Sequence, residues 1–333
     1  MKIWYKKICA LLISAILVLS MCAFVPIVTE KQDTVTDAHI YTVLPDSEEW
    51  ATMTLAERRK SCYVDEDEAT KMSTAGLVET VLNYPYFVDI YAFNSIEEGI
   101  ARVSRRFPPL AELLDRSDAN VALQEYLNKR HSINKKNLSV NSAEDHVSKT
   151  YGAQRLILII EKKQAVAEPN TLVFVKTPKG TSVPVFKGRT WAEAGISQEE
   201  ANVQSAVLLT RYKSAKLIYS ANPQYNCHSF AWYSASPSNP YWMNNPSPYM
   251  NDESYVSAGY TASATNKITY YEMHPQLGYT CIHSGIIQSN GQVISKWGVC
   301  AAFTHDIYDC PYAEPENPVP PPYVSVRYWK RNY

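Results

Sequence analysis

Two short segments carry the residues whose types suit covalent catalysis. The first is Tyr225-Asn-Cys-His-Ser-Phe-Ala-Trp232. Phe230, Ala231 and Ser234 follow Cys227 by three, four and seven residues, a spacing that predicts a helix starting at or near Cys227. The positive end of a helix stabilises a thiolate, and its free N–H groups can hold an oxyanion. The cysteine is therefore placed as a nucleophile, although a buried structural cysteine or half of a disulfide fits the same pattern.

The second segment places a histidine on a rigid strand. Residues 279–288, the turn Ser289-Asn-Gly-Gln292 and residues 293–298 predict a strand, a tight turn and a second strand. His283 lies in the middle of the first strand, where a period of two puts Cys281 and Gly285 on the same face. A histidine held there against a thiol on a neighbouring helix would form the thiolate–imidazolium pair of a cysteine hydrolase.

Both segments resemble parts of one superfamily. NCHSFAW resembles the nucleophile segment of CHAP amidases, and HSGIIQSNGQVIS resembles the histidine-bearing hairpin of NlpC-type cysteine peptidases. The order, with the cysteine first and the histidine on a later strand, matches these papain-like enzymes. The resemblance covers roughly residues 215–333. It implies an α+β, papain-like (NlpC/CHAP-type) domain with an antiparallel sheet that hydrolyses amide bonds, typically in peptidoglycan peptides.

The resemblance also implies roles for particular residues. Cys227 would be the nucleophile and His283 the general base. On the next strand the family carries a third polar residue, and the matching position here is Ser295, where the family has His, Glu or Asn. Serine carries no charge that could stabilise an imidazolium. His305 with Asp306 is the alternative for this orienting role.

Further residues are candidates for the substrate side of the site. Tyr225 could donate its hydroxyl to an oxyanion, and packing is the alternative for this aromatic side chain. The remaining candidates flank the predicted catalytic residues: Asn226, His228, Trp297 and His305. The aromatic stretch over residues 239–255 could stack on sugar rings, but packing is the favoured interpretation.

Other chemistries find less support. A zinc site built from His228, His283, His305 and Cys281 lacks the paired CxxC or HExxH spacing of known sites. The chain has neither a Gly-rich phosphate loop nor a GxSxG motif, which disfavours nucleotide and serine-hydrolase chemistry. We therefore predict no metal and no organic cofactor.

Composition bounds the class of protein. The 333 residues carry 32 Lys and Arg against 33 Asp and Glu, so no basic field suits nucleic acid. With 46% hydrophobic and 20% charged residues the chain is globular, and its length suits about two domains.

The N-terminus directs the chain out of the cytosol. Three lysines precede an apolar run from Ile8 to Val25, which predicts a signal peptide over residues 1–25 or, alternatively, a retained N-terminal anchor. The protein is thus expected to be extracytoplasmic, secreted or cell-surface associated, where disulfides form. If Cys227 is free, four cysteines outside the leader can pair: Cys62, Cys281, Cys300 and Cys310.

The pattern along the chain predicts a small all-α domain followed by the α+β domain. Residues 26–47 are a polar leader, 48–130 a helical domain, 131–153 a linker and 154–333 the papain-like amidase domain. Within the last, we expect strands at 155–160, 171–176, 182–186 and 323–329, and a helix over 192–212.

The predicted function is that of a secreted cysteine amidase or endopeptidase. Its partner would be peptidoglycan or an extracellular peptide or protein, with the helical domain either positioning the enzyme on a wall or occluding its site. The alternative is a non-catalytic cell-wall-binding or adhesion protein on the same fold. A Cys227 locked in a disulfide would favour that alternative.

Overall fold

The chain is a mixed α+β protein with antiparallel sheets. The computed structural model describes residues 37–131, 140–161, 171–259, 263, 266–274, 278–313 and 324–333. The predicted signal peptide, residues 1–25, and the first half of the polar leader, residues 26–36, lie outside the described residues. We call the described part up to residue 161 the helical half and the part from residue 171 the sheet half.

The helical half begins with seven α-helices and one 3-10 helix, which occupy the region predicted to be helical. Their bounds are α2 Glu48–Thr52, α3 Leu55–Ser61, α4 Glu66–Lys71, α5 Thr74–Asn83, η1 Phe87–Tyr91, α6 Ile96–Arg106, α7 Pro108–Asp115 and α8 Ala119–His131. Side-chain caps fix several starts. Thr54 and Glu57 form a capping box at α3, and Ser95 caps α6.

A ninth element corrects the expected linker. Residues 140–153, predicted to be a linker, and residues 155–160, predicted to be a strand, form one helix, α9 Val140–Ile160. Leu156 and Ile157 are buried in it, and Arg155 pairs with Glu200. The apolar run therefore packs as a helix, because tertiary contacts override its β-branched preference. The predicted boundary between residues 153 and 154 falls inside this helix.

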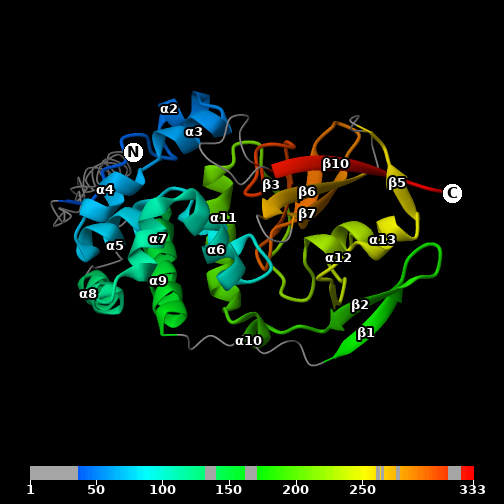
Figure 1. The fold of residues 1–333 in the computed structure, drawn as a ribbon, viewed down its shortest axis with the longest axis horizontal. Helices are drawn as coiled ribbons and strands as arrows, with labels where there is room; N and C mark the ends of the chain where they lie inside the picture. Colours follow the sequence, from blue (N-terminus) through cyan, green and yellow to red (C-terminus); the bar gives the residue numbers. More distant parts are fainter. Residues whose placement is uncertain are drawn as a thin grey trace, which may run out of the picture.

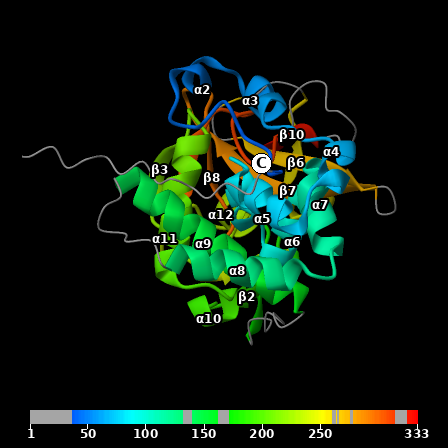
Figure 2. The same cartoon turned by 90° about the vertical axis from the view of Figure 1, so that its left-hand side faces the viewer.

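The described part of the sheet half contains four helices. They are α10 Trp191–Ala194, α11 Gln198–Arg211, α12 Cys227–Trp232 and α13 Pro248–Asn251. Figure 1 shows α11 between the helices of the helical half and the main sheet. In the turned view, α5, α6, α8 and α9 face the viewer, so the helical half covers one side of the molecule (Figure 2).

The main sheet has seven strands, each paired antiparallel to its neighbours. Its order is β3-β9-β8-β7-β6-β10-β5. The bounds are β3 Lys216–Tyr219, β5 Tyr255–Ser257, β6 Lys267–His274, β7 Gly278–Ile287, β8 Val293–Lys296, β9 Ala302–His305 and β10 Val324–Arg331. The predicted hairpin of β7 and β8 is confirmed, and Gly291 takes the positive φ of 83° that its turn requires. The predicted last strand is confirmed as β10.

A smaller sheet of three strands lies apart from the main one. It consists of β1 Leu172–Lys176, β2 Ser182–Lys187 and β4 Tyr241–Trp242, in the order β1-β2-β4. This confirms the strands predicted at residues 171–176 and 182–186. Trp242 is buried with the Arg189 guanidinium 4.0 Å from its ring centroid, and Tyr249 and Tyr255 are also buried. The packing interpretation of this aromatic stretch is therefore confirmed for these three side chains.

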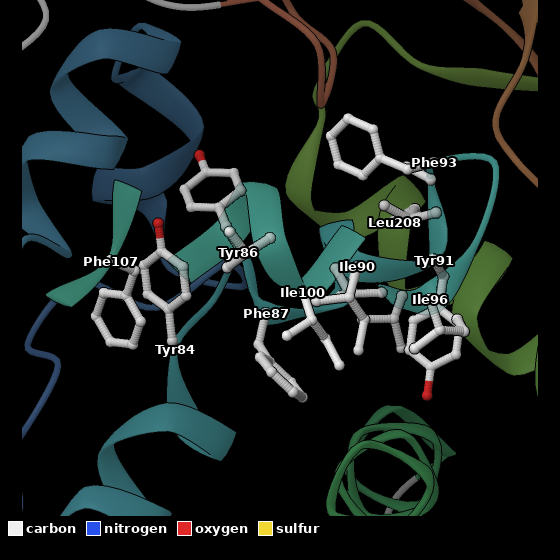
Figure 3. Close-up of a cluster of buried hydrophobic side chains, with 14 of the residues drawn as sticks. Tyr84, Tyr86, Phe87, Ile90, Tyr91, Phe93, Ile96, Ile100, Phe107 and Leu208 are labelled. Atoms are coloured by element: carbon white, nitrogen blue, oxygen red, sulfur yellow. The ribbon is translucent and has the colours of Figure 1, made fainter. Parts of the chain in front are cut away.

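One hydrophobic core joins the two halves. Its buried members run from Tyr41 in the helical half to Tyr328 in β10. Figure 3 shows Leu208 of α11 in the same cluster as Phe93, Ile90 and Ile96. Neither half thus completes its core alone. None of the helices in the described residues is both long and apolar enough to cross a membrane.

We expect Leu208→Ala to lower the free energy of unfolding by about 2–5 kcal/mol, because it opens a cavity in this core. Leu217→Ala is the matched control, because Leu217 is 54% exposed and Leu208 is fully buried. Urea unfolding followed by tryptophan fluorescence and by far-UV circular dichroism measures both variants. The shared core also predicts one transition for both signals, and two separate transitions would contradict it.

Candidate functional site

Cys227 is the first residue of α12, as predicted from its spacing. The preceding Asn226 caps the helix. Its side-chain oxygen accepts hydrogen bonds from the backbone N–H of Ser229 at 3.1 Å and of Met243 at 3.2 Å. Its amide nitrogen donates to the carbonyl of Met243 at 2.7 Å and to Asn94 Oδ1 at 3.0 Å. The fully bonded Asn226 therefore fixes where the helix starts and where the thiol lies.

The Cys227 thiol is buried, with 3% of the residue exposed. Burial raises its pKa well above the ordinary value for cysteine, and the backbone N–H groups of Ser284 and His228 oppose that rise. Because α12 has only six residues, its helix dipole is weak. The two backbone N–H groups are therefore the main interactions that favour the thiolate. At neutral pH the group is a thiol and needs a base before it can attack.

Strand β7 carries an irregularity next to the predicted base. His283 pairs with Tyr270, but Cys281 pairs with the adjacent Tyr271, so Ile282 is an extra residue in the strand. Consecutive residues of β6 face opposite sides, so Cys281 and His283 also lie on opposite faces. The expectation that they share a face is wrong, because a β-bulge shifts the alternation by one residue.

The side chain of β7 that bonds to α12 is Ser284. Its hydroxyl oxygen lies 2.8 Å from His228 Nδ1 and accepts a hydrogen bond from Trp232 Nε1 at 2.9 Å. His228 is buried, and burial lowers its pKa to about 4. This candidate residue therefore ties α12 to β7 as a neutral imidazole. No motif or spacing in the sequence pointed to Ser284.

His283 lies on the other face of β7 and is fully buried. Its ring stacks on Tyr312, with centroids 3.5 Å apart and an angle of 7° between the planes. Neither ring nitrogen has a hydrogen-bond partner in the described part of the chain, so no bond joins His283 to Cys227. Burial and the neighbouring His305 and His228 hold the pKa of His283 well below its ordinary value.

Ser295 and His305 form a pair of their own. Ser295 Oγ lies 2.9 Å from His305 Nε2, and His305 Nδ1 donates to the carbonyl of Asp306 at 2.9 Å. With the proton on Nδ1, Nε2 accepts the serine proton. The third candidate here, Trp297, donates from Nε1 to Ser295 Oγ at 3.0 Å. The structure thus brings Ser295, His305 and Trp297 together, whereas none of them bonds to His283.

Tyr225 lies over a buried lysine that sequence reasoning missed. The Tyr225 hydroxyl has no hydrogen-bond partner among the described residues, and burial raises its pKa to about 12. The Lys296 ammonium is 5.2 Å from the centroid of its ring and donates to the carbonyls of Gly298 and Cys300. Burial lowers the pKa of Lys296 to about 7. A lone lysine in a short strand gives no signal of such burial.

All five described cysteines, Cys62, Cys227, Cys281, Cys300 and Cys310, are free. The expected pairing of the four other than Cys227 is therefore wrong for this structure, in which each thiol lies in its own packed surroundings. Within the described ranges, no group of three His, Cys, Asp or Glu side chains could hold a metal ion.

Comparison of the chain with protein-family models, with curated proteins and with solved structures finds no match. The site is therefore interpreted from its own geometry.

Buried neutral histidines predict loss of stability in acid. The unfolded chain protonates His228 near pH 6.5, but the folded chain does so only near pH 4. The stabilisation is thus complete above pH 6.5 and is lost as the pH falls towards 4, by about 3 kcal/mol at most. We expect His228→Asn to reduce the slope of this part of the stability curve, measured by urea unfolding between pH 4 and 7.5. Parallel curves for wild type and variant would contradict the assignment.

Proposed function

We propose that the chain is an exported cysteine amide hydrolase, with Cys227 as nucleophile and His283 as general base. We further propose that α12 and the antiparallel sheet correspond to the helix and sheet of a papain-like (NlpC/CHAP-type) domain. The substrate class is the peptide part of peptidoglycan. One observation carries the proposal. Cys227 is the first residue of a helix capped by Asn226, and this helix lies beside β7, whose buried His283 makes no hydrogen bond at either ring nitrogen among the described residues.

The contrast with neighbouring histidines gives that observation its weight. Buried polar groups are almost always hydrogen-bonded, and leaving one unpaired costs about 1–3 kcal/mol. His228 bonds to Ser284 and His305 bonds to Ser295, as structural histidines do. His283 is equally buried and makes no such bond among the described residues. A ring whose nitrogens make no hydrogen bond is available to accept a proton.

In the proposed reaction the thiol and the ring would meet at the edge of β7. Strands β7 and β8 pair only at Ile286–Ile294 and Ile287–Val293. The residues of β7 before Ile286 are therefore not paired with β8 and form a free edge. The Ser284 N–H, which acts on the Cys227 sulfur, belongs to this edge. Pairing of Cys227 with His283 requires the ring to leave Tyr312 and turn about χ1 towards that edge. A change of rotamer of this kind is fast once the space is open.

The reaction then follows from the two groups. A His283 nitrogen takes the proton of the Cys227 thiol, and the thiolate attacks the amide carbonyl carbon. Backbone N–H groups at the start of α12, such as that of His228, would stabilise the negative oxygen. The amine leaves with the proton from His283, and a thioester remains on Cys227. Water, deprotonated by His283, hydrolyses the thioester and restores the thiol.

A non-catalytic wall-binding or adhesion protein is the second candidate. It is favoured by the burial of both Cys227 and His283, and by the bonding of Ser295 to His305 instead of His283. In that case His283 and Tyr312 are packing residues of a domain that binds without cutting.

We expect Cys227→Ala to reduce the release of peptide fragments from purified peptidoglycan by about a thousandfold or more, as loss of a nucleophile does. Mass spectrometry of the soluble fraction measures the release. Cys62→Ala is the matched control, because Cys62 is an equally buried free thiol in the helical half.

Equal release by wild type and Cys227→Ala would contradict the cysteine mechanism. Absence of release by wild type, together with co-sedimentation of the protein with insoluble peptidoglycan, would support the binding candidate.

A further inference from the structure

A short segment of the sheet half lies directly over the predicted base. We call residues 309–313, which follow β9, the closing segment. Its Tyr312 ring stacks on the ring of His283 at 3.5 Å between centroids. Tyr312 is itself 1% exposed, and Cys310 and Ala313 on either side are also buried. One face of the His283 ring is therefore covered by Tyr312, and Tyr270 also packs against the ring, with centroids 5.5 Å apart.

The helical half holds the closing segment in place at four points. Tyr312 donates its hydroxyl proton to the carbonyl of Ala92, just after η1. The other three points are arginine side chains: Arg58 to Asp309 at 2.8 Å, Arg59 to the carbonyl of Ala313 at 2.5 Å and Arg106 to the carbonyl of Pro311 at 3.0 Å. Hydrogen bonds from charged donors are stronger than neutral ones. The segment is thus fastened by side chains more than 200 positions away in sequence.

The same part of the helical half also reaches the cysteine side of the site. Asn94 accepts a hydrogen bond from Asn226, the residue that caps α12 directly before Cys227. Phe93 lies edge-on to Tyr312, with centroids 5.4 Å apart. Figure 3 shows that Phe93 and Tyr91 extend from the same stretch of chain. The loop after η1 therefore contacts the neighbours of both predicted catalytic residues.

The elements that carry the site are joined independently of this cover. Strand β7 bonds to α12 through Ser284, His228 and Trp232, and none of these contacts involves the helical half. If its arginine contacts break, the closing segment could move away while α12 stays on β7. The bonds that join α12 to β7 are thus distinct from those that hold the closing segment.

We propose that the helical half is a built-in inhibitor, which holds the closing segment over His283 and keeps the Cys227–His283 site shut until that segment is released. The inference rests on the proposed function and names the regulation of the same site. In the closed state Tyr312 holds the ring of His283 away from Cys227. Release frees the ring to turn and opens the thiol to substrate.

The test loosens the closing segment and measures access to Cys227 in the full-length chain. Arg106→Gln removes one charged donor, and Tyr312→Phe removes the bond to Ala92 but keeps the ring. Arg116→Gln is the matched control, because Arg116 also lies in the helical half but bonds to Glu112, Thr70 and Met72. Iodoacetamide labels the exposed thiols, and peptide mass spectrometry gives the rate at each cysteine. Cys62, buried in the helical half, reports general unfolding.

We expect Arg106→Gln to raise the rate of Cys227 labelling about tenfold or more and Tyr312→Phe to raise it severalfold, with Cys62 unchanged. Arg116→Gln should label as wild type does. Equal Cys227 rates in all four proteins would overturn the proposal, as would a parallel rise at Cys62.

Hydrolysis of peptidoglycan is measured on the same samples. A rise in both Cys227 labelling and hydrolysis supports the inhibitor and the enzyme. A rise in labelling with no hydrolysis supports closure by the helical half and overturns the amidase, so the two failures can be told apart.

Discussion

Paired charges buried between the helices and the sheet determine how the two halves of this protein fit together. Arg102 of α6 bonds to Glu272 of β6, Arg155 of α9 to Glu200 of α11, and Arg58 of α3 to Asp309. Removing one partner of such a pair leaves a buried charge without compensation, which costs about 3–5 kcal/mol. In any other arrangement of the two halves, several of these charges would be buried without a partner. The charges therefore select one arrangement, and the apolar core around α11 stabilises it.

This arrangement decides the state of the candidate site. Local contacts build the site, since Asn226 caps α12 and Ser284 joins it to β7. Contacts between the two halves cover the site. The Tyr312 hydroxyl bonds to the carbonyl of Ala92, and Asn226 bonds to Asn94. A glycine marks how close the halves come: a Cβ on Gly298 would lie 2.3 Å from the carbonyl oxygen of Phe93. The chain must pass without a side chain there.

Local signals in the sequence predicted local structure well. The spacing after Cys227 located the start of α12, and the Asn-Gly turn located the hairpin of β7 and β8, because each depends on neighbours within a few residues. The sequence could not locate α9, whose apolar end also reads as a strand. The bulge at Ile282, the pairing of Ser295 with His305 and the burial of Lys296 depend on strands that meet only in the fold. The papain-like arrangement and the roles of Cys227 and His283 stay predictions.

The energetics of His283 link these observations. Two unpartnered nitrogens make its burial unfavourable, at about 1–3 kcal/mol for each unpaired group. A stacked aromatic pair contributes only about 0.5–1.5 kcal/mol beyond its buried area, so Tyr312 alone does not offset that cost. The remaining stabilisation comes from the arginine contacts of the closing segment and from the shared core. His283 is thus held in an unfavourable position by interactions remote from it. Weakening those interactions lowers the cost of opening without disturbing the bonds that keep α12 on β7.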